Sequence, residues 1–157
     1  MRTQSPLTVG TLQQRGPFAR LGRAVRVFPE IDSTNTFLLS NIDELPDGTI
    51  VAAEFQTAGR GRLGRTWSAP RGSSVLLSVL LHEAVESPIS THAALFGALA
   101  ACEAVRTATA LPAAVRWPND LVLARRKVGG VLGETRRLRD ERRIGVVIGI
   151  GINCWEQ

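Results

Sequence analysis

The chain has 157 residues, of which 44% are hydrophobic and 21% are charged, and its formal net charge is +5. These proportions are typical of one globular domain and exclude a fibrous or wholly disordered chain. The basic residues are spread over several segments rather than gathered into one stripe, so the net charge alone is weak support for a nucleic-acid binder.

The cysteines and the apolar segments bear on where the protein works. Cys102 and Cys154 are far apart and have no metal-ligand spacing, so we expect reduced thiols. No apolar segment of signal-peptide type stands at the beginning of the sequence. The longest apolar run with helical character, Ala93 to Cys102, is too short to cross a membrane. We therefore expect a soluble, cytoplasmic protein without a membrane partner.

The chain changes character near residue 23. Residues 1–22 have no steady hydrophobic period, so we expect a loosely ordered lead-in there and one folded domain over 23–157. Residues 23–28 alternate with the period of a strand. Short polar residues then precede an apolar run, which predicts the capped start of a short helix. The capping candidates are Asp32, Ser33 and Thr34.

A glycine- and arginine-rich stretch follows the next predicted strand. That strand spans Thr49 to Phe55, and at Gln56 it opens towards Gly59-Arg60-Gly61-Arg62-Leu63-Gly64-Arg65-Thr66-Trp67. Glycine lets a ligand approach the main chain, and the planar fork of arginine suits carboxylates and phosphates. Three arginines this close together could not be buried without partners, so we expect an exposed loop that binds an anionic ligand. Arg-Gly repeats also occur in disordered RNA-binding tails, but those are long and repetitive.

The second half of the chain alternates several strands with one long helix. Ser87 and Pro88 begin an alanine-rich helix that is expected to run to about Thr109. The predicted strands are an apolar one at 73–82, a hairpin at 114–123, a strand with paired glycines at 127–134 and a buried strand at 143–153. Glycines inside an apolar strand indicate close approach by a ligand or by another backbone. Because strands follow strands with few helices between them, we predict an α+β fold, a mixed and largely antiparallel sheet with helices packed on one face.

Five blocks in these segments resemble the biotin protein ligases, in the order that this family has them, and together they are highly specific. They are Asp32-Ser33-Thr34-Asn35, the loop Gly59 to Trp67, Arg116-Trp117-Pro118-Asn119-Asp120, Lys127-Val128-Gly129-Gly130-Val131-Leu132 and Gly149-Ile150-Gly151-Ile152-Asn153. The resemblance implies a fold like that of the class II aminoacyl-tRNA synthetases. It also implies a ligase that makes biotinyl-5′-AMP from biotin and ATP and passes biotin to a lysine of a biotin carboxyl carrier domain. Mg²⁺ would enter with the ATP phosphates rather than in an all-protein metal site.

The resemblance further implies which residues form the site. The residues expected at biotin are Ser33, Thr34, Asn35, Gln56, Gly59, Arg60, Gly61, Arg62, Lys127 and Gly130. Those expected at ATP are Arg62, Arg65, Trp67, Asn119, Asp120 and Asn153, and the catalytic residues are Arg62 and Lys127. The chemistry agrees, because joining a carboxylate to a phosphate brings two anions into contact and requires positive charge. Lys127 is the only lysine beside 18 arginines, which suggests a place that needs a compact ammonium group.

Two features depart from the family's pattern. Arg116 stands where the family usually has lysine. Family members also continue beyond the segments present here into a small C-terminal β-barrel domain, and some have a helix-turn-helix domain ahead of them. We therefore expect an incomplete catalytic domain, without DNA binding through such a domain. The alternatives are a truncated biotin-binding fragment without turnover, a lipoate-type protein ligase or transferase of the same fold, and a nucleic-acid binder.

Overall fold

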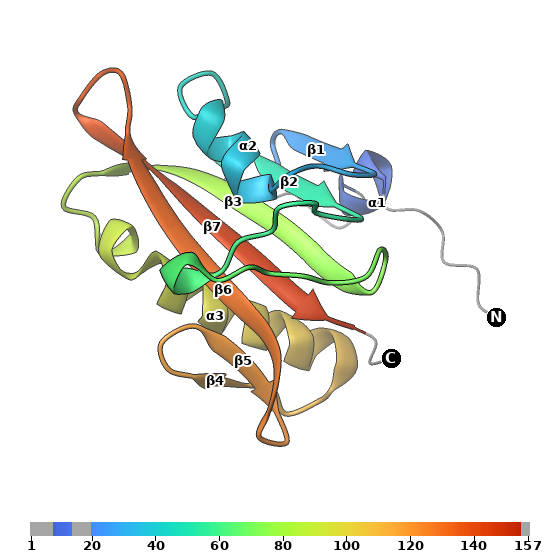
Figure 1. The fold of residues 1–157 in the computed structure, drawn as a ribbon. Helices are drawn as coiled ribbons and strands as arrows, with labels where there is room; N and C mark the ends of the chain where they lie inside the picture. Colours follow the sequence, from blue (N-terminus) through green and yellow to red (C-terminus); the bar gives the residue numbers. More distant parts are fainter. Residues whose placement is uncertain (1–7, 14–19, 155–157) are drawn as a thin grey trace.

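The computed structural model describes residues 8–13 and 20–154, which contain one mixed sheet of seven strands (Figure 1). The strands are β1 (Val25–Phe28), β2 (Ile50–Ala53), β3 (Ser74–Ala84), β4 (Ala114–Arg116), β5 (Asp120–Leu123), β6 (Arg126–Arg137) and β7 (Arg143–Asn153). Their order across the sheet is β1-β2-β3-β7-β6-β5-β4. The pair β1 and β2 is parallel, whereas all other neighbours are antiparallel. The predicted α+β class with a mixed, largely antiparallel sheet is confirmed.

Two helices cover the two faces of this sheet. They are α2 (Thr34–Ser40) and α3 (Pro88–Thr109), and a short helix, α1 (Val9–Gln13), lies in the described part of the lead-in. Along β7, Val147 packs in the hydrophobic cluster of α2, whereas Val146 and Ile148 pack in the cluster of α3. Because successive side chains of a strand point to opposite faces, the helices lie on opposite sides, with α3 behind the sheet in Figure 1. Our expectation that the helices share one face is therefore wrong. Most of the lead-in expected over 1–22 lies outside the described residues.

Small residues allow α3 to lie close against the sheet. A Cβ atom on Gly97 would stand 2.5 Å from Cγ2 of Ile148, and one on Gly133 would stand 2.9 Å from Cβ of Ala93. By length and composition alone, α3 is also long and apolar enough to cross a membrane, although the apolar run within it looked too short in the sequence. In this fold its small-residue face, including Ala98 and Ala101, is buried in the main core.

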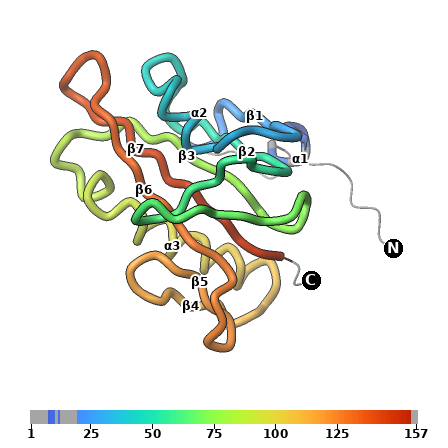
Figure 2. Tube along the Cα trace, in the orientation of Figure 1, coloured from blue at the N-terminus to red at the C-terminus, as the bar shows by residue number. Residues whose placement is uncertain are grey.

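The opposite face of β6 and β7 is nearly flat, because glycines replace side chains there. Gly149 and Gly151 of β7 pair with Leu132 and Gly130 of β6. A Cβ atom on Gly149 would lie 2.1 Å from Oδ1 of Asn35, and one on Gly151 would lie 2.6 Å from Cε2 of the tryptophan that ends the glycine loop. Figure 2 traces the segment that contains this loop, in green, across the front of the sheet. The alternating glycines therefore provide the space in which the loop and α2 meet the sheet.

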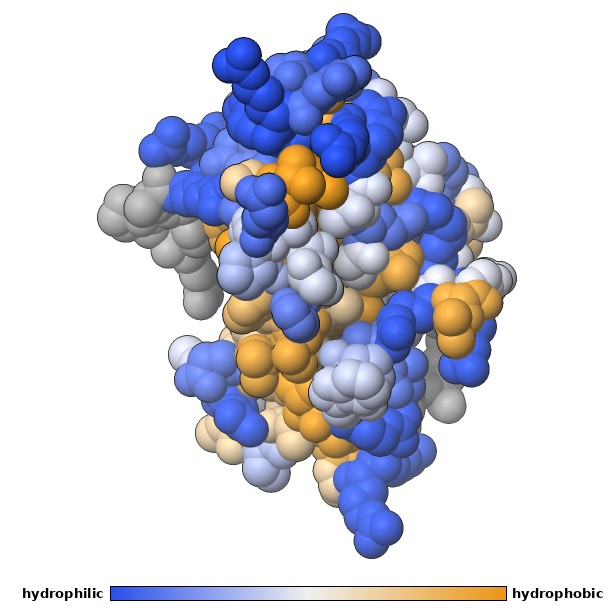
Figure 3. Space-filling model, turned by 90° about the vertical axis from the view of Figure 1, so that its left-hand side faces the viewer, coloured by the Kyte–Doolittle hydropathy of each residue, from blue (hydrophilic) through white to orange (hydrophobic). Residues whose placement is uncertain are grey.

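The turn between β6 and β7 is solvated and basic. Arg139 is exposed there, as are Arg137 and Arg143 at the ends of the two strands, and Figure 3 shows many hydrophilic residues at this upper end of the molecule. Asp43, which follows α2, accepts a hydrogen bond from the main-chain N–H of Arg139 at 2.7 Å and one from Arg136 at 3.2 Å. These contacts attach the turn to the end of α2.

Candidate functional site

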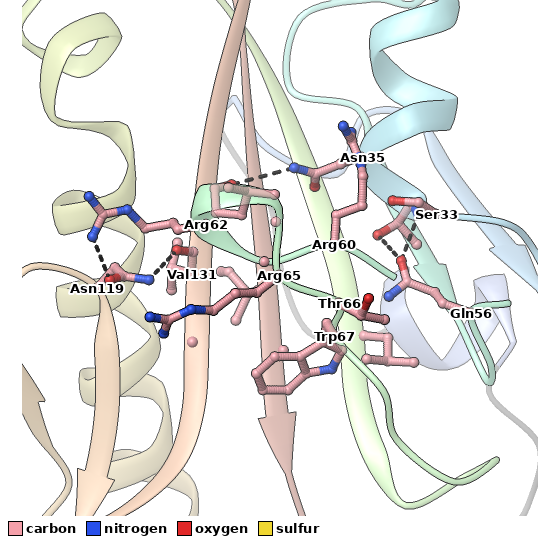
Figure 4. A pocket seen from close by; sticks show the side chains of 18 of the residues that line it. Ser33, Asn35, Gln56, Arg60, Arg62, Arg65, Thr66, Trp67, Asn119 and Val131 are labelled. Atoms are coloured by element: carbon pink, nitrogen blue, oxygen red, sulfur yellow. Dashed lines mark hydrogen bonds between the residues drawn. The ribbon is translucent and has the colours of Figure 1, made fainter. Parts of the chain in front are cut away.

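A cavity of about 340 Å³ opens on the glycine face, between α2, the glycine loop, β3 and the β5–β6 region (Figure 4). It brings together most of the side chains that the sequence predicted for a site. These are Ser33, Thr34, Asn35, Gln56, Arg60, Gly61, Arg62, Arg65, Trp67, Asn119, Asp120, Lys127 and Gly130. In Figure 4, Ser33, Asn35 and Gln56 stand on one side of the cavity, whereas Arg62 and Arg65 extend towards Asn119 on the other.

Two of the predicted residues do not line the cavity. Gly59 is buried at the base of the glycine loop, where its carbonyl accepts a hydrogen bond from the N–H of Trp67 at 2.9 Å. A Cβ atom at this position would stand 2.4 Å from the carbonyl oxygen of Trp67, so the loop can close there only with glycine. Asn153 ends β7 on the surface, and its Oδ1 accepts a hydrogen bond from Ser74 at 3.1 Å. Both residues shape the surroundings of the cavity.

The glycine loop is closed by its own main chain. The N–H of Gly61 donates to the carbonyl of Arg65 at 2.7 Å, across a single turn that contains Leu63. Leu63 has a φ of 59° and its side chain is 87% exposed, so this apolar residue stands at the tip of the loop. Arg62 and Arg65 flank the tip and both line the cavity. The loop thus presents its guanidinium groups to the cavity.

One end of the cavity is built from uncharged hydrogen-bonding groups. Oε1 of Gln56 accepts from the N–H of Thr34 at 2.8 Å, and the hydroxyl of Thr34 lies 2.6 Å from that of Ser78. Ser78 donates to Oδ1 of Asn35 at 2.6 Å. The hydroxyl of Thr34 also donates to Oε1 of Gln56 at 3.0 Å, so its single proton has two neighbouring acceptors, Gln56 and Ser78. These hydrogen bonds hold Thr34, Asn35, Ser78 and Oε1 of Gln56 in place at this end.

Ser33 has a role in the fold as well as a place in the cavity. It is the N-cap of α2, and its hydroxyl accepts from the N–H of Thr36 at 3.4 Å. The capping role that the sequence indicated is therefore present, and it starts α2 so that Thr34 and Asn35 are presented to the cavity.

The other end of the cavity contains positive charge. Nη1 of Arg62 donates to Oδ1 of Asn119 at 2.9 Å, and Nδ2 of Asn119 donates to the carbonyl of Val131 at 2.9 Å. Asn119 thus connects the loop to β6 across the opening. Among the described residues, neither Arg62 nor Arg65 forms an ion pair. Their charge is available to an anionic ligand.

Asp120 lies between two cations at the same end. Its Oδ1 is 2.7 Å from Nζ of Lys127, and its Oδ2 is 2.7 Å from Nη2 of Arg116. Burial by itself would raise the pKa of Asp120, but the hydrogen bonds from Lys127 and Arg116 outweigh it and hold the pKa below its usual range. Asp120 is therefore a carboxylate at neutral pH. Arg116, where the resemblance led us to expect lysine, supplies one of its two partners.

The acidic groups near the cavity do not form a metal site. Asp120 is the one acidic residue among the lining side chains of the described chain, and both of its oxygens are taken by cations. No group of three or more His, Cys, Asp or Glu residues that could hold a metal ion occurs within 8–13 and 20–154. The donor set does not fit a metal held by protein groups alone.

Comparison with protein families identifies this arrangement. Residues 27–153 match the model of the biotin/lipoate A/B protein ligase family. The chain belongs to this family. The match contains the whole cavity, from α2 to the end of β7.

Curated relatives in the family are biotin ligases. The chain is 41% identical over 133 residues to the bifunctional ligase/repressor BirA of Escherichia coli. This alignment covers 84% of this chain and 41% of that protein. It is 33% identical over 163 residues to the biotin--[acetyl-CoA-carboxylase] ligase of Mycobacterium tuberculosis, covering 99% of this chain and 59% of that protein. The chain therefore spans about two fifths to three fifths of the length of these relatives.

Solved structures of the family share the fold. The biotin acetyl coenzyme A carboxylase synthetase of Helicobacter pylori, solved with biotinylated ATP, superimposes with a TM-score of 0.69 at 27% identity, over 86% of this chain and 63% of that one. The biotin protein ligase of Aquifex aeolicus, solved with biotin and ATP, gives a TM-score of 0.65 at 32% identity, over 86% of this chain and 55% of that one.

The sequence did not predict Leu76, Ile150 and several other residues that line the cavity, nor two residues behind the lining, Ser78 and Glu134, that hold the lining side chains in place. Ser78 is fully buried and joins Thr34 to Asn35. The sequence could have indicated it, because Ser78 is a polar residue within an apolar run, and a polar side chain that is buried needs hydrogen-bond partners. Glu134 accepts hydrogen bonds from Asn35 and Arg60. The sequence could have indicated it, because alternate residues of a strand share a face and Glu134 therefore lies on the same face of β6 as Gly130 and Leu132.

Proposed function

We propose that this chain forms the biotin-activating part of a biotin–protein ligase. In this reaction biotin and ATP give biotinyl-5′-AMP, and biotin then passes to a lysine of a biotin carboxyl carrier domain. The observation that carries the proposal is the division of one cavity into an uncharged hydrogen-bonding end and a cationic end. That division suits biotin, which has a neutral ureido ring at one end and a carboxylate at the other. The names of the relatives point to the same substrates.

The uncharged end would receive the ureido ring. A ureido group has two N–H donors and one carbonyl acceptor, and it binds well where such groups meet fixed partners of the opposite kind. Thr34, Asn35 and Gln56 offer these partners, with Ser33 beside them. Gly130, also proposed at biotin, lies next to Lys127 and Trp67. Because hydrogen bonds already orient these side chains, little conformational entropy would be lost on binding. Gly59, Arg60 and Gly61 would close the loop over the chain of biotin.

The cationic end would hold the reacting groups. A carboxylate oxygen of biotin attacks the α-phosphorus of ATP, the bond from this phosphorus to the bridging oxygen breaks, and pyrophosphate leaves with the electron pair. Both reactants are anions, so preorganised cations at the reacting atoms lower the barrier. Lys127 and Arg62 are the catalytic residues in this proposal, and Arg65 adds a third cation.

Trp67, Asn119 and Asp120 complete the nucleotide end. The indole of Trp67 lies over Gly151, and a broad aromatic face offers contact area to a purine ring. Asn119 holds Arg62 across the opening, and Asp120 holds Lys127. Asn153 lies beyond the cavity at the end of β7 and would act only on the outer part of a nucleotide. When bound, Mg²⁺ would arrive with the ATP phosphates and neutralise part of their charge, since residues 8–13 and 20–154 contain no cluster of side chains that could hold it.

The second step would transfer biotin to the acceptor. The ε-amine of the carrier lysine attacks the acyl carbon of biotinyl-5′-AMP, the bond to the phosphate oxygen breaks with its electron pair leaving on AMP, and the proton that the amine loses passes to water. We place this activity in the cytoplasm, where ATP and carboxylases are found and where Cys102 and Cys154 would stay as the free thiols that the structure has.

Release of pyrophosphate tests the proposal. The chain is incubated with ATP and biotin, with ATP alone, and with ATP and lipoic acid, while biotin affinity is measured separately by calorimetry. We expect pyrophosphate only with biotin. Biotin binding without pyrophosphate would leave a binding fragment, and pyrophosphate with lipoic acid would favour a lipoate ligase. Failure to bind either acid would overturn the proposal.

A further inference from the structure

We propose that Glu134 is a positioning residue that ties the glycine loop to the sheet and fixes the uncharged end of the cavity. Oε2 of Glu134 accepts from Nη2 of Arg60 at 2.8 Å and from Nδ2 of Asn35 at 2.8 Å. Glu134 itself does not line the cavity, whereas Arg60 and Asn35 both do. It would therefore act on a ligand through these two residues. The role in catalysis rests on the proposed function, but the attachment of the loop does not.

The contact with Asn35 determines which way its amide points. Asn35 is 4% exposed, and its Oδ1 accepts from Ser78 at 2.6 Å. Its Nδ2 has one strong acceptor, Glu134, because the other contact, to the carbonyl of Leu132, is 3.4 Å long. When a buried amide loses its acceptor, its N–H donor is left without a hydrogen bond and without water, which destabilises the fold. Without Glu134, Nδ2 of Asn35 would have no good acceptor, and we expect the side-chain amide to rotate.

The contact with Arg60 joins the loop to the centre of the sheet. Glu134 pairs in register with Val147, next to the glycine face on which the loop lies. Its side chain is 23% exposed and that of Arg60 is 42% exposed, so the pair is partly shielded from solvent. A charge-assisted bond of this kind is stronger than a neutral one. Figure 4 shows Arg60 between the loop and Asn35, the place where such a tie is needed.

The tie also sets the charge that a ligand meets. Arg60 is paired with Glu134, whereas Arg62 and Arg65 have no ion pair among the described residues. Lys127 and Arg116 share the single negative charge of Asp120, so that group of three keeps a positive charge. An anionic group is therefore drawn to Arg62 and Arg65 at the far end, and the uncharged head is left at Asn35. Through Glu134, the cavity would distinguish the two ends of its ligand.

Limited trypsin digestion tests the loop without any need for activity. Trypsin cuts after arginine, so Arg60, Arg62 and Arg65 are sites inside the loop, and Arg139 in the β6–β7 turn is an internal reference. In Glu134→Ala we expect cleavage within the loop to be about tenfold faster and cleavage in the distant turn to be unchanged. Glu134→Gln keeps an acceptor oxygen and should restore most of the protection. Glu103→Ala, which removes an exposed ion pair with Arg106, is the matched control and should leave both rates unchanged.

Ligand measurements on the same variants test the second contact. Glu134→Ala should weaken biotin binding about tenfold to a hundredfold, in keeping with a lost charged hydrogen bond, and should raise KM for biotin more than KM for ATP. Glu134→Ala would also be combined with Arg60→Ala and, separately, with Asn35→Ala. Each double variant should lose less free energy of biotin binding than the sum of the losses in its two single variants. Unchanged loop cleavage, or additive effects in both cycles, would overturn the proposal. A chain that binds no biotin but shows the faster cleavage would refute the proposed function and leave the tie in place.

Discussion

One carboxylate oxygen of Asp120 lies 2.7 Å from the ammonium group of Lys127, and the other oxygen forms an ion pair with Arg116. Lys127 is thus fixed at the cavity wall by a partner that is itself fixed. Holding a charge at the reacting atoms before the substrate arrives avoids a reorganisation cost during the reaction. The arrangement gives a physical reason for a lysine at 127, since a compact ammonium group fits beside one carboxylate oxygen.

The first prediction concerns the charge of Lys127. Lys127→Ala should reduce formation of biotinyl-5′-AMP by about a hundredfold or more, because one preorganised charge at the reacting centre is lost. The side chain is 43% exposed, so the free energy of unfolding should change little. Adenylate formation would be measured by pyrophosphate release, and stability by urea unfolding.

Lys127→Arg is the matched control for this change. It keeps the positive charge but replaces a compact group with a broad fork, so activity should be recovered only in part. A Lys127→Ala variant that makes biotinyl-5′-AMP at the parent rate would remove Lys127 from the mechanism.

The second prediction separates the two ends of the cavity with two glycines. In Gly149→Ala the new Cβ atom would meet Oδ1 of Asn35 at 2.1 Å, and in Gly151→Ala it would meet the indole of Trp67 at 2.6 Å. Each variant should lose about 1–3 kcal/mol of stability through overpacking. Gly149→Ala should chiefly weaken biotin binding, and Gly151→Ala should chiefly raise KM for ATP. Each variant is the control for the other, so equal losses for both ligands would contradict the division of the cavity.

Local signals in the sequence predicted most of the elements well. β7 spans Arg143–Asn153 as predicted, because its continuous apolar run has clear ends. α3 begins at Pro88 after the N-cap Ser87, as the capping pattern indicated. β2 is shorter than predicted and spans Ile50–Ala53. The faces taken by the two helices were predicted wrongly, because this choice depends on which alternate side chains of β3 and β7 meet each helix, and no local signal carries that information.

Many of the residues that line the cavity were predicted from the sequence, but the contacts between them were not. The blocks that contain Arg62, Asn119 and Lys127 do meet in one cavity. Ser78 and Glu134 stayed hidden because each acts through neighbours from distant segments, and only the sheet register brings them together. Long-range pairing of this kind cannot be obtained from periodicity alone.

The third prediction concerns Arg62 as part of the closing loop. Arg62→Gly should let biotinyl-5′-AMP escape, because the bond from Arg62 to Asn119 that spans the opening is lost. The escaped anhydride would acylate lysines of a bystander protein, which mass spectrometry would detect. Stability should change by only about 0.5 kcal/mol, since the residue is exposed.

Arg139→Gly is the control for a glycine placed at an exposed arginine, because Arg139 lies in the distant β6–β7 turn and is 79% exposed. It should not change bystander labelling. Unaltered biotin affinity in Arg62→Gly, together with no rise in bystander labelling, would count against a closing role.

The fourth prediction concerns acid stability at Asp47, far from the cavity. Burial would raise the pKa of Asp47, but hydrogen bonds from Arg20 and from the N–H of His82 outweigh it and lower the pKa. A carboxylate with a lowered folded pKa contributes stability above its unfolded pKa, near 3.9, and loses the contribution as the pH falls through the folded value. Asp47→Asn should therefore cost about 1 kcal/mol at pH 7, a value kept small because the pair is partly exposed.

Urea unfolding at pH 7 and at pH 3 would check the sign. The difference between Asp47→Asn and the parent should shrink at the lower pH. A difference that is the same at both pH values would show that Asp47 acts through packing instead of charge. Glu103→Gln, which alters an exposed ion pair on α3, should differ little from the parent at either pH.

The last prediction is that this 157-residue chain hardly biotinylates itself, even when it releases activated biotin. Biotinyl-5′-AMP acylates amines, and the one ε-amine of the chain belongs to Lys127, whose ammonium group is paired with Asp120 inside the site. The 18 arginines are no substitute, because guanidinium groups stay protonated and are poor nucleophiles. The α-amino group of Met1, which lies outside the described residues, is the remaining target.

Mass spectrometry after incubation with biotin and ATP should therefore find no adduct, or one confined to the N-terminus. Chain unfolded in urea and treated with an amine-reactive biotin ester is the positive control, because Lys127 then loses its partner and should be labelled. In the folded chain, the same ester should label Asp120→Asn at Lys127 faster than the parent. An adduct on Lys127 of the folded parent after incubation with biotin and ATP would mean that its amine is free to react, which would contradict its proposed place beside the ligand.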